Sequence, residues 1–330
     1  MIDSMNPFAL AFVIALTASG THATGAPVPS PTPTKGARSA ADDYVDHGRA
    51  LYRAGKSAAA IELYGQAIDA DPKDLVAYVL RGVAKTSLGD YKGALTDYDY
   101  VIELDPQYEY AYISRCGTRD IMNDEKDAVA DCSTALSLDP TDELAWDRRG
   151  RAEFYLNDYK SAEADLSKAI SLNDADGDAY ADRCQTRNYV GDYDQARADC
   201  DRAVTLSPDK AYALMARGDL EEGVGEYAAA IADLSKCLVK DPTVANCHFY
   251  RGRAYLNLDE WDHARSDFGA YLVTFSDDGD ALYDKALAEK HLGDFTSAIT
   301  DAKAALKQYK INGDLSDAAD AQKMLDSLHG

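Results

Sequence analysis

A single spacing dominates this sequence, because an alanine returns every 34 residues, eight times in succession. These alanines are Ala60, Ala94, Ala128, Ala162, Ala196, Ala230, Ala264 and Ala298. The same register is kept by a proline at 72, 106, 140, 208 and 242, and by an Arg-Gly pair at 81–82, 149–150, 217–218 and 251–252. A period of this length, without insertion or deletion, predicts a stack of similar units that bury their apolar faces against one another.

Each unit has the pattern of two helices joined by a turn. In the second unit, Tyr78 and Ala84 share one face of a first helix, and Gly89 ends that helix. Asp90 can cap the helix that follows, and Pro106 ends it because proline breaks a helix interior. The unit is therefore expected to form an antiparallel helical hairpin.

These residues resemble the tetratricopeptide repeat family. Its pattern of an aromatic residue, then glycine, in the first helix is matched by Tyr78 and Gly82, and its alanine and aromatic residue in the second helix by Ala94 and Tyr98. The resemblance implies an all-α fold, a right-handed α-solenoid (superhelix) of antiparallel helix pairs. Its eight repeats span residues 41–312, as 41–74, 75–108, 109–142, 143–176, 177–210, 211–244, 245–278 and 279–312. Because the register is unbroken, we expect one continuous array, followed by a C-terminal capping helix within residues 313–330.

The first 40 residues lie outside the repeats. Residues 8–17 form an apolar run that is too short to span the roughly 30 Å of a membrane but is typical of a signal-peptide core. We predict a cleaved signal peptide at residues 1–23 and a Pro/Ser/Thr-rich linker at residues 24–40, with an uncleaved hydrophobic tail as the alternative. Asp3 is atypical of such a signal, and translation from Met5 would remove it. The mature protein is then expected to be periplasmic or secreted, without membrane insertion.

The six cysteines fall into matched pairs. Two pairs hold the same two places in the third and fifth units, and the last pair joins the end of the sixth unit to the start of the seventh. In the repeat geometry the members of each pair face each other, and an exported protein meets an oxidising environment. We therefore predict the disulfides Cys116–Cys132, Cys184–Cys200 and Cys237–Cys247. The alternatives are small buried hydrophobic residues or, less well supported by their dispersed positions, zinc ligands.

Arginine recurs at one place of the first helix, and aspartate at one place of the second. The arginines are Arg81, Arg115, Arg149, Arg183, Arg217 and Arg251. The aspartates are Asp97, Asp131, Asp165, Asp199, Asp233 and Asp267, and Asp301 continues the series. We interpret them as a ladder of partly buried ion pairs, within a hairpin or between neighbours, that fixes packing register. The alternative, a row of arginines for an anionic ligand, is disfavoured by the matching aspartates.

Composition and motifs argue against several kinds of chemistry. Acidic residues outnumber basic ones 57 to 34, giving a net charge of −23 that repels nucleic acid and anionic membrane surfaces. The histidines are scattered, and no nucleophile motif or phosphate-binding loop is present. A calcium-loop resemblance at residues 174–178 fails, because Leu172 and Arg183 occupy ligand places. We expect no catalytic residues, no metal and no cofactor.

In similar arrays the first helices line a concave face, and exposed apolar or aromatic residues there indicate a binding surface. The residues expected to bind are Val76, Val79, Val83, Tyr110, Ile113, Leu144, Arg148, Arg151, Tyr155, Tyr189, Tyr212, Met215, Phe249, Tyr250 and Arg253. Ordinary surface positions or packing between units are the alternative for each residue. The places at which related proteins clamp a chain-terminal carboxylate carry Val, Ile, Asp and Leu, which disfavours that clamp.

These features predict an exported, non-catalytic scaffold that binds a peptide or protein partner in its groove. One alternative is a structural or assembly subunit of a cell-envelope or secretion complex. Another, less well supported, is an enzyme with an unrecognised site. The sequence assigns neither the partner's identity nor an oligomeric state.

Overall fold

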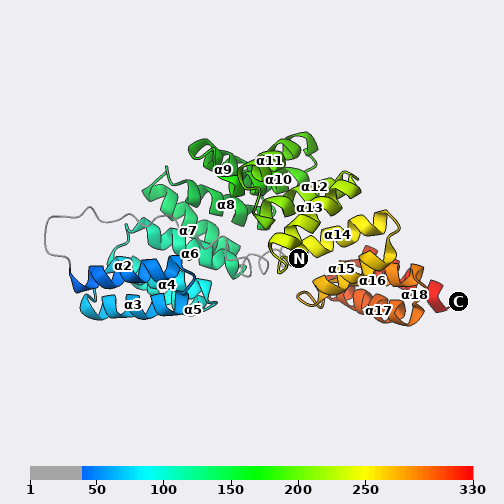
Figure 1. The fold of residues 1–330 in the computed structure, drawn as a ribbon, viewed down its shortest axis with the longest axis horizontal. Helices are drawn as coiled ribbons and strands as arrows, with labels where there is room; N and C mark the ends of the chain where they lie inside the picture. Colours follow the sequence, from blue (N-terminus) through cyan, green and yellow to red (C-terminus); the bar gives the residue numbers. More distant parts are fainter. Residues whose placement is uncertain (1–38, 330) are drawn as a thin grey trace. The chain divides into compact units, whose positions relative to one another are not determined.

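The computed structural model describes residues 39–329 (Figure 1), and within them the secondary structure is helical, with no strand. The helices are α2 (Ala40–Arg53), α3 (Ser57–Ala70), α4 (Leu75–Ser87), α5 (Tyr91–Leu104), α6 (Glu109–Ile121), α7 (Glu125–Leu138), α8 (Glu143–Tyr155), α9 (Tyr159–Leu172), α10 (Gly177–Tyr189), α11 (Tyr193–Leu206), α12 (Ala211–Gly223), α13 (Tyr227–Lys240), α14 (Ala245–Asn257), α15 (Trp261–Leu272), α16 (Gly279–His291), α17 (Phe295–Asn312) and α18 (Leu315–His329). The predicted signal peptide and all but the last two residues of the predicted linker lie outside the described residues.

Each predicted unit corresponds to one helix pair, from α2–α3 to α16–α17, and α18 packs against α17. The predicted all-α solenoid is thus confirmed. The chain divides into two compact units, described here as residues 39–174 and residues 175–329. Within each unit, every first helix contacts the first helix of the next repeat, so the first helices form a continuous row. The predicted join of all eight repeats into one array concerns how the two units meet, and it stays a prediction.

The turn between paired helices is built as its residues predict. Gly89 has φ +80°, a left-handed conformation that glycine adopts without steric cost. Asp90 then accepts a hydrogen bond from the backbone nitrogen of Gly93 and caps α5. Asn157 takes the glycine's place in the fourth repeat, with φ 63°. Asparagine is one of the few residue types other than glycine that tolerate the left-handed backbone conformation.

The core of each hairpin lies where its two helices cross. The eight periodic alanines, from Ala60 to Ala298, are all fully buried there. Gly82 faces the ring of Tyr98, and a Cβ atom added at Gly82 would lie 2.5 Å from Cε1 of that ring. The absence of a side chain on one helix therefore makes room for a large one on the other, and the backbones approach closely.

Candidate functional site

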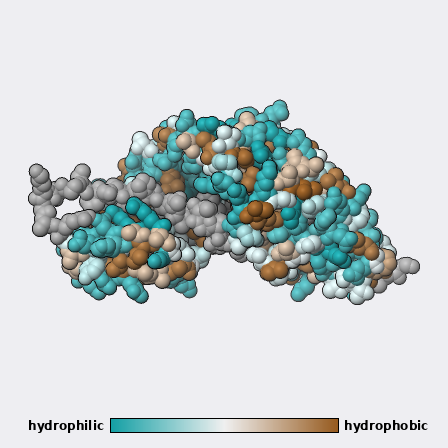
Figure 2. Space-filling model, in the orientation of Figure 1, coloured by the Kyte–Doolittle hydropathy of each residue, from teal (hydrophilic) through white to brown (hydrophobic). Residues whose placement is uncertain are grey.

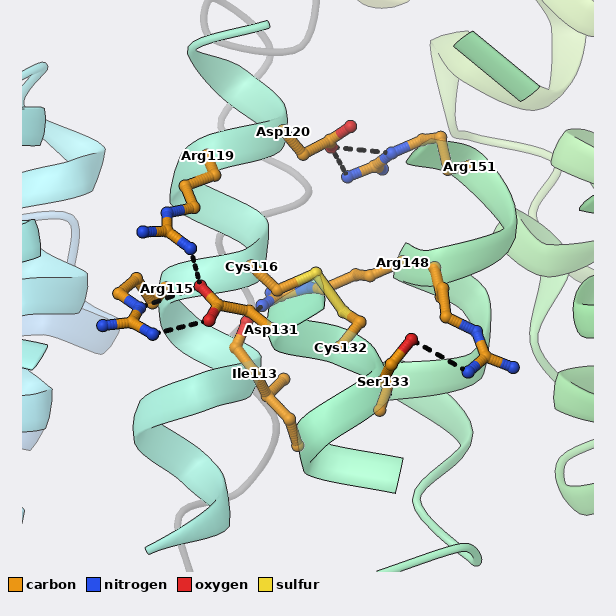
Figure 3. The surroundings of a disulfide bond; sticks show 12 residues. Ile113, Arg115, Cys116, Arg119, Asp120, Asp131, Cys132, Ser133, Arg148 and Arg151 are labelled. Atoms are coloured by element: carbon orange, nitrogen blue, oxygen red, sulfur yellow. Dashed lines mark hydrogen bonds and ion pairs between the residues drawn. A yellow bond between two sulfur atoms is a disulfide. The ribbon is translucent and has the colours of Figure 1, made fainter. Parts of the chain in front are cut away.

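The cysteines pair as predicted, in all three disulfides. Cys116 and Cys132, drawn in Figure 3, have Cα atoms 5.6 Å apart and join α6 to α7. They occupy the repeat places that Gly82 and Tyr98 hold one unit earlier. Cys184 and Cys200 occupy the same two places in the fifth repeat and form the second disulfide. A disulfide thus stands where other hairpins pack glycine against a large side chain.

The arginine and aspartate ladder forms within hairpins. In the third repeat, Arg115 binds Asp131 through two hydrogen bonds of 2.8 and 2.6 Å, and Arg119 adds a third of 2.7 Å (Figure 3). Arg115 also reaches Asp99 of the preceding repeat, at 2.6 Å. The same first-helix arginine binds the same second-helix aspartate in all six repeats from the second to the seventh. These arginines are neutralised inside the fold, so they do not form a free row for an anionic ligand.

A second ladder position was missed by sequence reasoning. The place of Arg119 is also basic in the second and fifth repeats, but glutamate occupies it in the fourth, sixth and eighth, at Glu153, Glu221 and Glu289. One carboxylate oxygen of each of these glutamates is buried without a hydrogen-bond partner. Burial and the adjacent ladder aspartate raise the pKa of Glu153 and of Glu221 to about 7. The sequence contains a pattern that could have revealed this position, because these glutamates recur every 68 residues.

Three residues of the expected binding strip lie in the hydrophobic core. Val79 packs into the core with Tyr98, Ile113 packs with Leu136, and Phe249 packs with Phe268. These places on the first helix face other helices of the core, so their side chains are not available to a partner. Four more of the predicted residues have low exposed fractions in the structure, and their role in binding stays a prediction: Arg151, Tyr155, Tyr212 and Met215. The hydroxyl of Tyr212 donates to Asp182, and Arg151 pairs with Asp120.

The remaining predicted residues are at least partly accessible. Tyr189 is exposed over 50% of its surface. The half-buried members are Val76, Val83, Tyr110, Leu144, Arg148, Tyr250 and Arg253. Figure 2 shows that hydrophobic side chains on the visible surface are interspersed among hydrophilic ones. The accessible members of the predicted strip are a mixture of aliphatic, aromatic and charged side chains.

In residues 39–174, the first-helix face includes Arg148, whose guanidinium group is fixed by a hydrogen bond to the backbone. Nη1 of Arg148 donates a 2.6 Å hydrogen bond to the backbone oxygen of Ile113. Gly117 leaves the space for this guanidinium, because a Cβ atom there would lie 2.5 Å from Nη1. Burial, and then the charge of Arg151, lower the pKa of Arg148. The chain thus fixes one cation on this face by removing a side chain opposite it.

In residues 175–329, the first-helix face is acidic. Arg253 of α14 interacts electrostatically with Asp219 and Glu222 of α12, with Asp284 of α16 and with Tyr250 of its own helix. Nε of Arg253 lies 3.5 Å from Oε1 of Glu222. Burial, followed by the charge of Glu222, raises the pKa of Asp219 to about 7, and burial is also the main cause that raises the pKa of Asp284 to about 7. We call Asp219, Glu222 and Asp284, with Arg253, the acidic face; its three carboxylates were not predicted.

Two kinds of feature are absent from the described residues. No group of histidine, cysteine and acidic side chains within residues 39–329 is arranged to hold a metal ion. None of the described helices is both long and apolar enough to cross a membrane.

Comparison with known proteins identifies the family. One tetratricopeptide repeat model matches residues 45–109, 188–245 and 250–310, and a second matches residues 144–176. The first alone covers more than half of the chain, so the chain belongs to the tetratricopeptide repeat family. No curated protein matches the chain.

Solved structures agree on the fold. A tetratricopeptide repeat protein from Parabacteroides merdae aligns with 76% of this chain and 98% of its own, at 21% identity and a TM-score of 0.59. The structure of the APC/C hetero-tetramer Cut9–Hcn1 matches 87% of this chain, at 16% identity and a TM-score of 0.73, and the match spans 55% of that structure's chain. The two matches show a shared fold of helix pairs, and at identities this low they show the fold alone.

Proposed function

We propose that this chain is an exported, non-catalytic scaffold that binds a peptide or protein partner on the concave face formed by its first helices. The family fold supports a protein-interaction scaffold. The observation that carries the proposal is the set of charged and aromatic side chains on successive first helices that the Arg–Asp ladder does not use. Arg253, Tyr250 and Asp284 are examples. Arginine and tyrosine are enriched among residues that anchor protein interfaces.

The disulfides support export. Disulfides such as these three form and persist in oxidising compartments and are rare in the cytosol. A periplasmic or secreted location also agrees with the signal peptide predicted at residues 1–23.

A second candidate function is favoured by exposed apolar side chains outside the first-helix face. Val239 lies near the end of α13 and Val273 directly follows α15; both are more than four-fifths exposed. Ile311 and Leu315 are exposed near the junction of α17 and α18. A structural subunit of a cell-envelope or secretion complex would use such positions at the edges and end of the array.

Affinity capture with matched variants tests the first-helix proposal against the second. Tyr189→Asp places a charge at the end of first helix α10, where the tyrosine is 50% exposed. Phe295→Asp is the control, because this aromatic residue is 54% exposed at the start of second helix α17 in the same unit. We expect the wild-type chain and Phe295→Asp to retain the same partners and Tyr189→Asp to lose them. Loss only with Phe295→Asp would favour the second candidate and reject the first.

A further inference from the structure

Arg148 of α8 is a half-buried cation that forms no ion pair in the described part of the chain. Its hydrogen bond there joins Nη1 to the backbone oxygen of Ile113. Oδ2 of Asp120, on the preceding first helix α6, is occupied by Arg151. Burial has the largest effect on the pKa of Arg148 and lowers it, and the charges of Asp120 and Asp147 do not reverse this effect. The guanidinium thus lacks the bonded carboxylate that would offset its loss of hydration.

The contact between Arg148 and Gly117 does not belong to the packing that recurs in every repeat. Arg148 is the only basic residue at its place among the eight repeats, and Gly117 is the only glycine at its place. The backbone does not require the contact either. Ile113 lies inside α6, where its carbonyl accepts the helical hydrogen bond from the residue four positions later. An unrepeated cation with its own space points to a role other than packing.

The ladder shows how an arginine of this chain binds a carboxylate. Arg81 donates from Nε and from Nη2 to the two carboxylate oxygens of Asp97, at 2.9 and 2.6 Å. The same edge of the guanidinium binds an aspartate in Arg115, Arg149, Arg183 and Arg251. In Arg148 the atom in use is Nη1, so Nε and Nη2 have no partner among the described residues, and neither atom is fully buried. The edge that binds carboxylates elsewhere in the chain is therefore open in Arg148.

We infer that Arg148 binds the carboxylate of an aspartate or glutamate side chain of the partner, so that residues 39–174 recognise an acidic residue. The inference rests on the proposed function. The carboxylate would accept two parallel hydrogen bonds from Nε and Nη2, as Asp97 does from Arg81. A side chain carries its carboxylate away from the backbone, so it can reach a half-buried guanidinium.

The charge of the surroundings favours a carboxylate over a phosphate. One guanidinium balances one negative charge, and the same place in the two preceding repeats holds Leu80 and Ser114, which supply no second cation. A phosphate dianion would keep an unbalanced charge in a chain whose net charge is −23.

Binding of defined peptides to the full-length chain tests this inference. The probes are two fluorescein-labelled peptides with an amidated C-terminus, one of alternating glutamate and glycine and one of alternating glutamine and glycine, measured by fluorescence anisotropy at physiological salt. Because the net charge of −23 repels the glutamate peptide, a preference for it must come from a local cation. We expect the wild-type chain to bind the glutamate peptide about tenfold more tightly than the glutamine peptide, and Arg148→Gln to lose this preference. Equal affinity of the wild-type chain for both peptides would overturn the inference.

Two further variants separate the fixed guanidinium from a general effect of charge. Lys168→Gln removes the same charge from an exposed position on α9, the second helix of the same repeat, and should change the affinity by less than about twofold because salt screens exposed charges. Gly117→Ala keeps the charge of Arg148 but places a methyl group in the space of its guanidinium, so it should also weaken binding of the glutamate peptide. Equal loss in Lys168→Gln and Arg148→Gln would overturn the inference, and circular dichroism would show whether each variant remains folded.

Two further peptides identify the anion. One is the glutamine and glycine peptide with a free C-terminal carboxylate, and the other is an amidated peptide of alternating phosphoserine and glycine. We expect both to bind the wild-type chain more weakly than the glutamate peptide. If either binds as tightly or more tightly, the assignment to an acidic side chain is wrong.

The partner captured with the wild-type chain separates failure of this inference from failure of the proposed function. If Tyr189→Asp abolishes capture but Arg148→Gln does not weaken it, the first-helix face binds the partner and the inference about Arg148 is wrong. If neither variant affects capture, both are wrong. If both variants weaken capture and the partner's bound segment contains aspartate or glutamate, both are supported.

Discussion

At the scale of the residue, each hairpin crossing joins two residues that lie 16 positions apart and share a limited volume. Gly82 meets Tyr98 in the second repeat, Cys116 bonds to Cys132 in the third, and in the eighth the same two places hold alanines. The combinations are glycine with a large residue, cysteine with cysteine, and alanine with alanine. Interiors packed at crystal-like density explain why the two positions change together.

Substitution of Gly82 tests this steric pairing. In Gly82→Ala the new methyl group would lie 2.5 Å from the ring of Tyr98, which is buried and has little room to move. We expect a loss of about 1–2 kcal/mol of unfolding free energy, because overpacking outweighs the better helix propensity of alanine. Gly65→Ala in α3 is the control, since its Cβ atom meets nothing within 4 Å. It should be neutral or stabilising by up to about 1 kcal/mol. Urea unfolding measures both, and equal effects would contradict the pairing.

At the scale of the element, two of the disulfides join the paired helices of a single repeat. The two hairpins with internal disulfides keep the same helix lengths as their neighbours. Each of these two disulfides therefore adds a covalent link to a hairpin that the repeat already specifies.

Removal of one disulfide should lower stability without changing the fold. Cys116→Ala with Cys132→Ala recreates the alanine pair of the eighth repeat. We expect a loss of about 3 kcal/mol of unfolding free energy, from the chain entropy that closure of this loop removes from the unfolded state. Far-ultraviolet circular dichroism should be unchanged, and a reducing agent should destabilise this variant less than the wild-type chain. A variant without helical structure would show that the bond is required for folding.

The ladder glutamates make the free energy of unfolding depend on pH. Their ordinary pKa is 4.5, and burial beside a ladder aspartate raises the pKa of Glu153 and Glu221 to about 7. Between these two values the folded chain holds protons that the unfolded chain has released. Their contribution to stability is therefore full below about pH 4.5 and is lost as the pH rises through about 7.

The pair Glu153→Gln and Glu221→Gln isolates this contribution. Glutamine keeps the shape of the side chain but does not titrate in this range. We expect the variant to lose less stability than the wild-type chain between pH 5 and pH 8, as measured by urea midpoints. Asp219 and Asp284, whose pKa values are also raised to about 7, should leave a remaining slope of the same sign. An unchanged slope in the variant would contradict the assignment.

At the scale of the whole molecule, the sequence predicts the hairpins better than it predicts their exposed face. The periodic alanines, glycines and prolines reflect the packing of the helices, and this packing recurs in every unit. The helices α2 to α17 and the cysteine pairs could therefore be predicted. A binding face does not repeat: Asp219 is equivalent to Arg253, and Tyr250 is equivalent to Asp284. Val79 and Phe249 were misplaced because one position on a helix, a rotation of about 100°, decides between core and surface.

Hydrogen–deuterium exchange on the complex with its captured partner tests the central claim, that the first helices form the binding face. Backbone amides of α10, α12, α14 and α16 should gain protection when the partner binds, while those of α11, α13, α15 and α17 should change little. Protection confined to the second helices, or to the end of the array at α18, would contradict the claim.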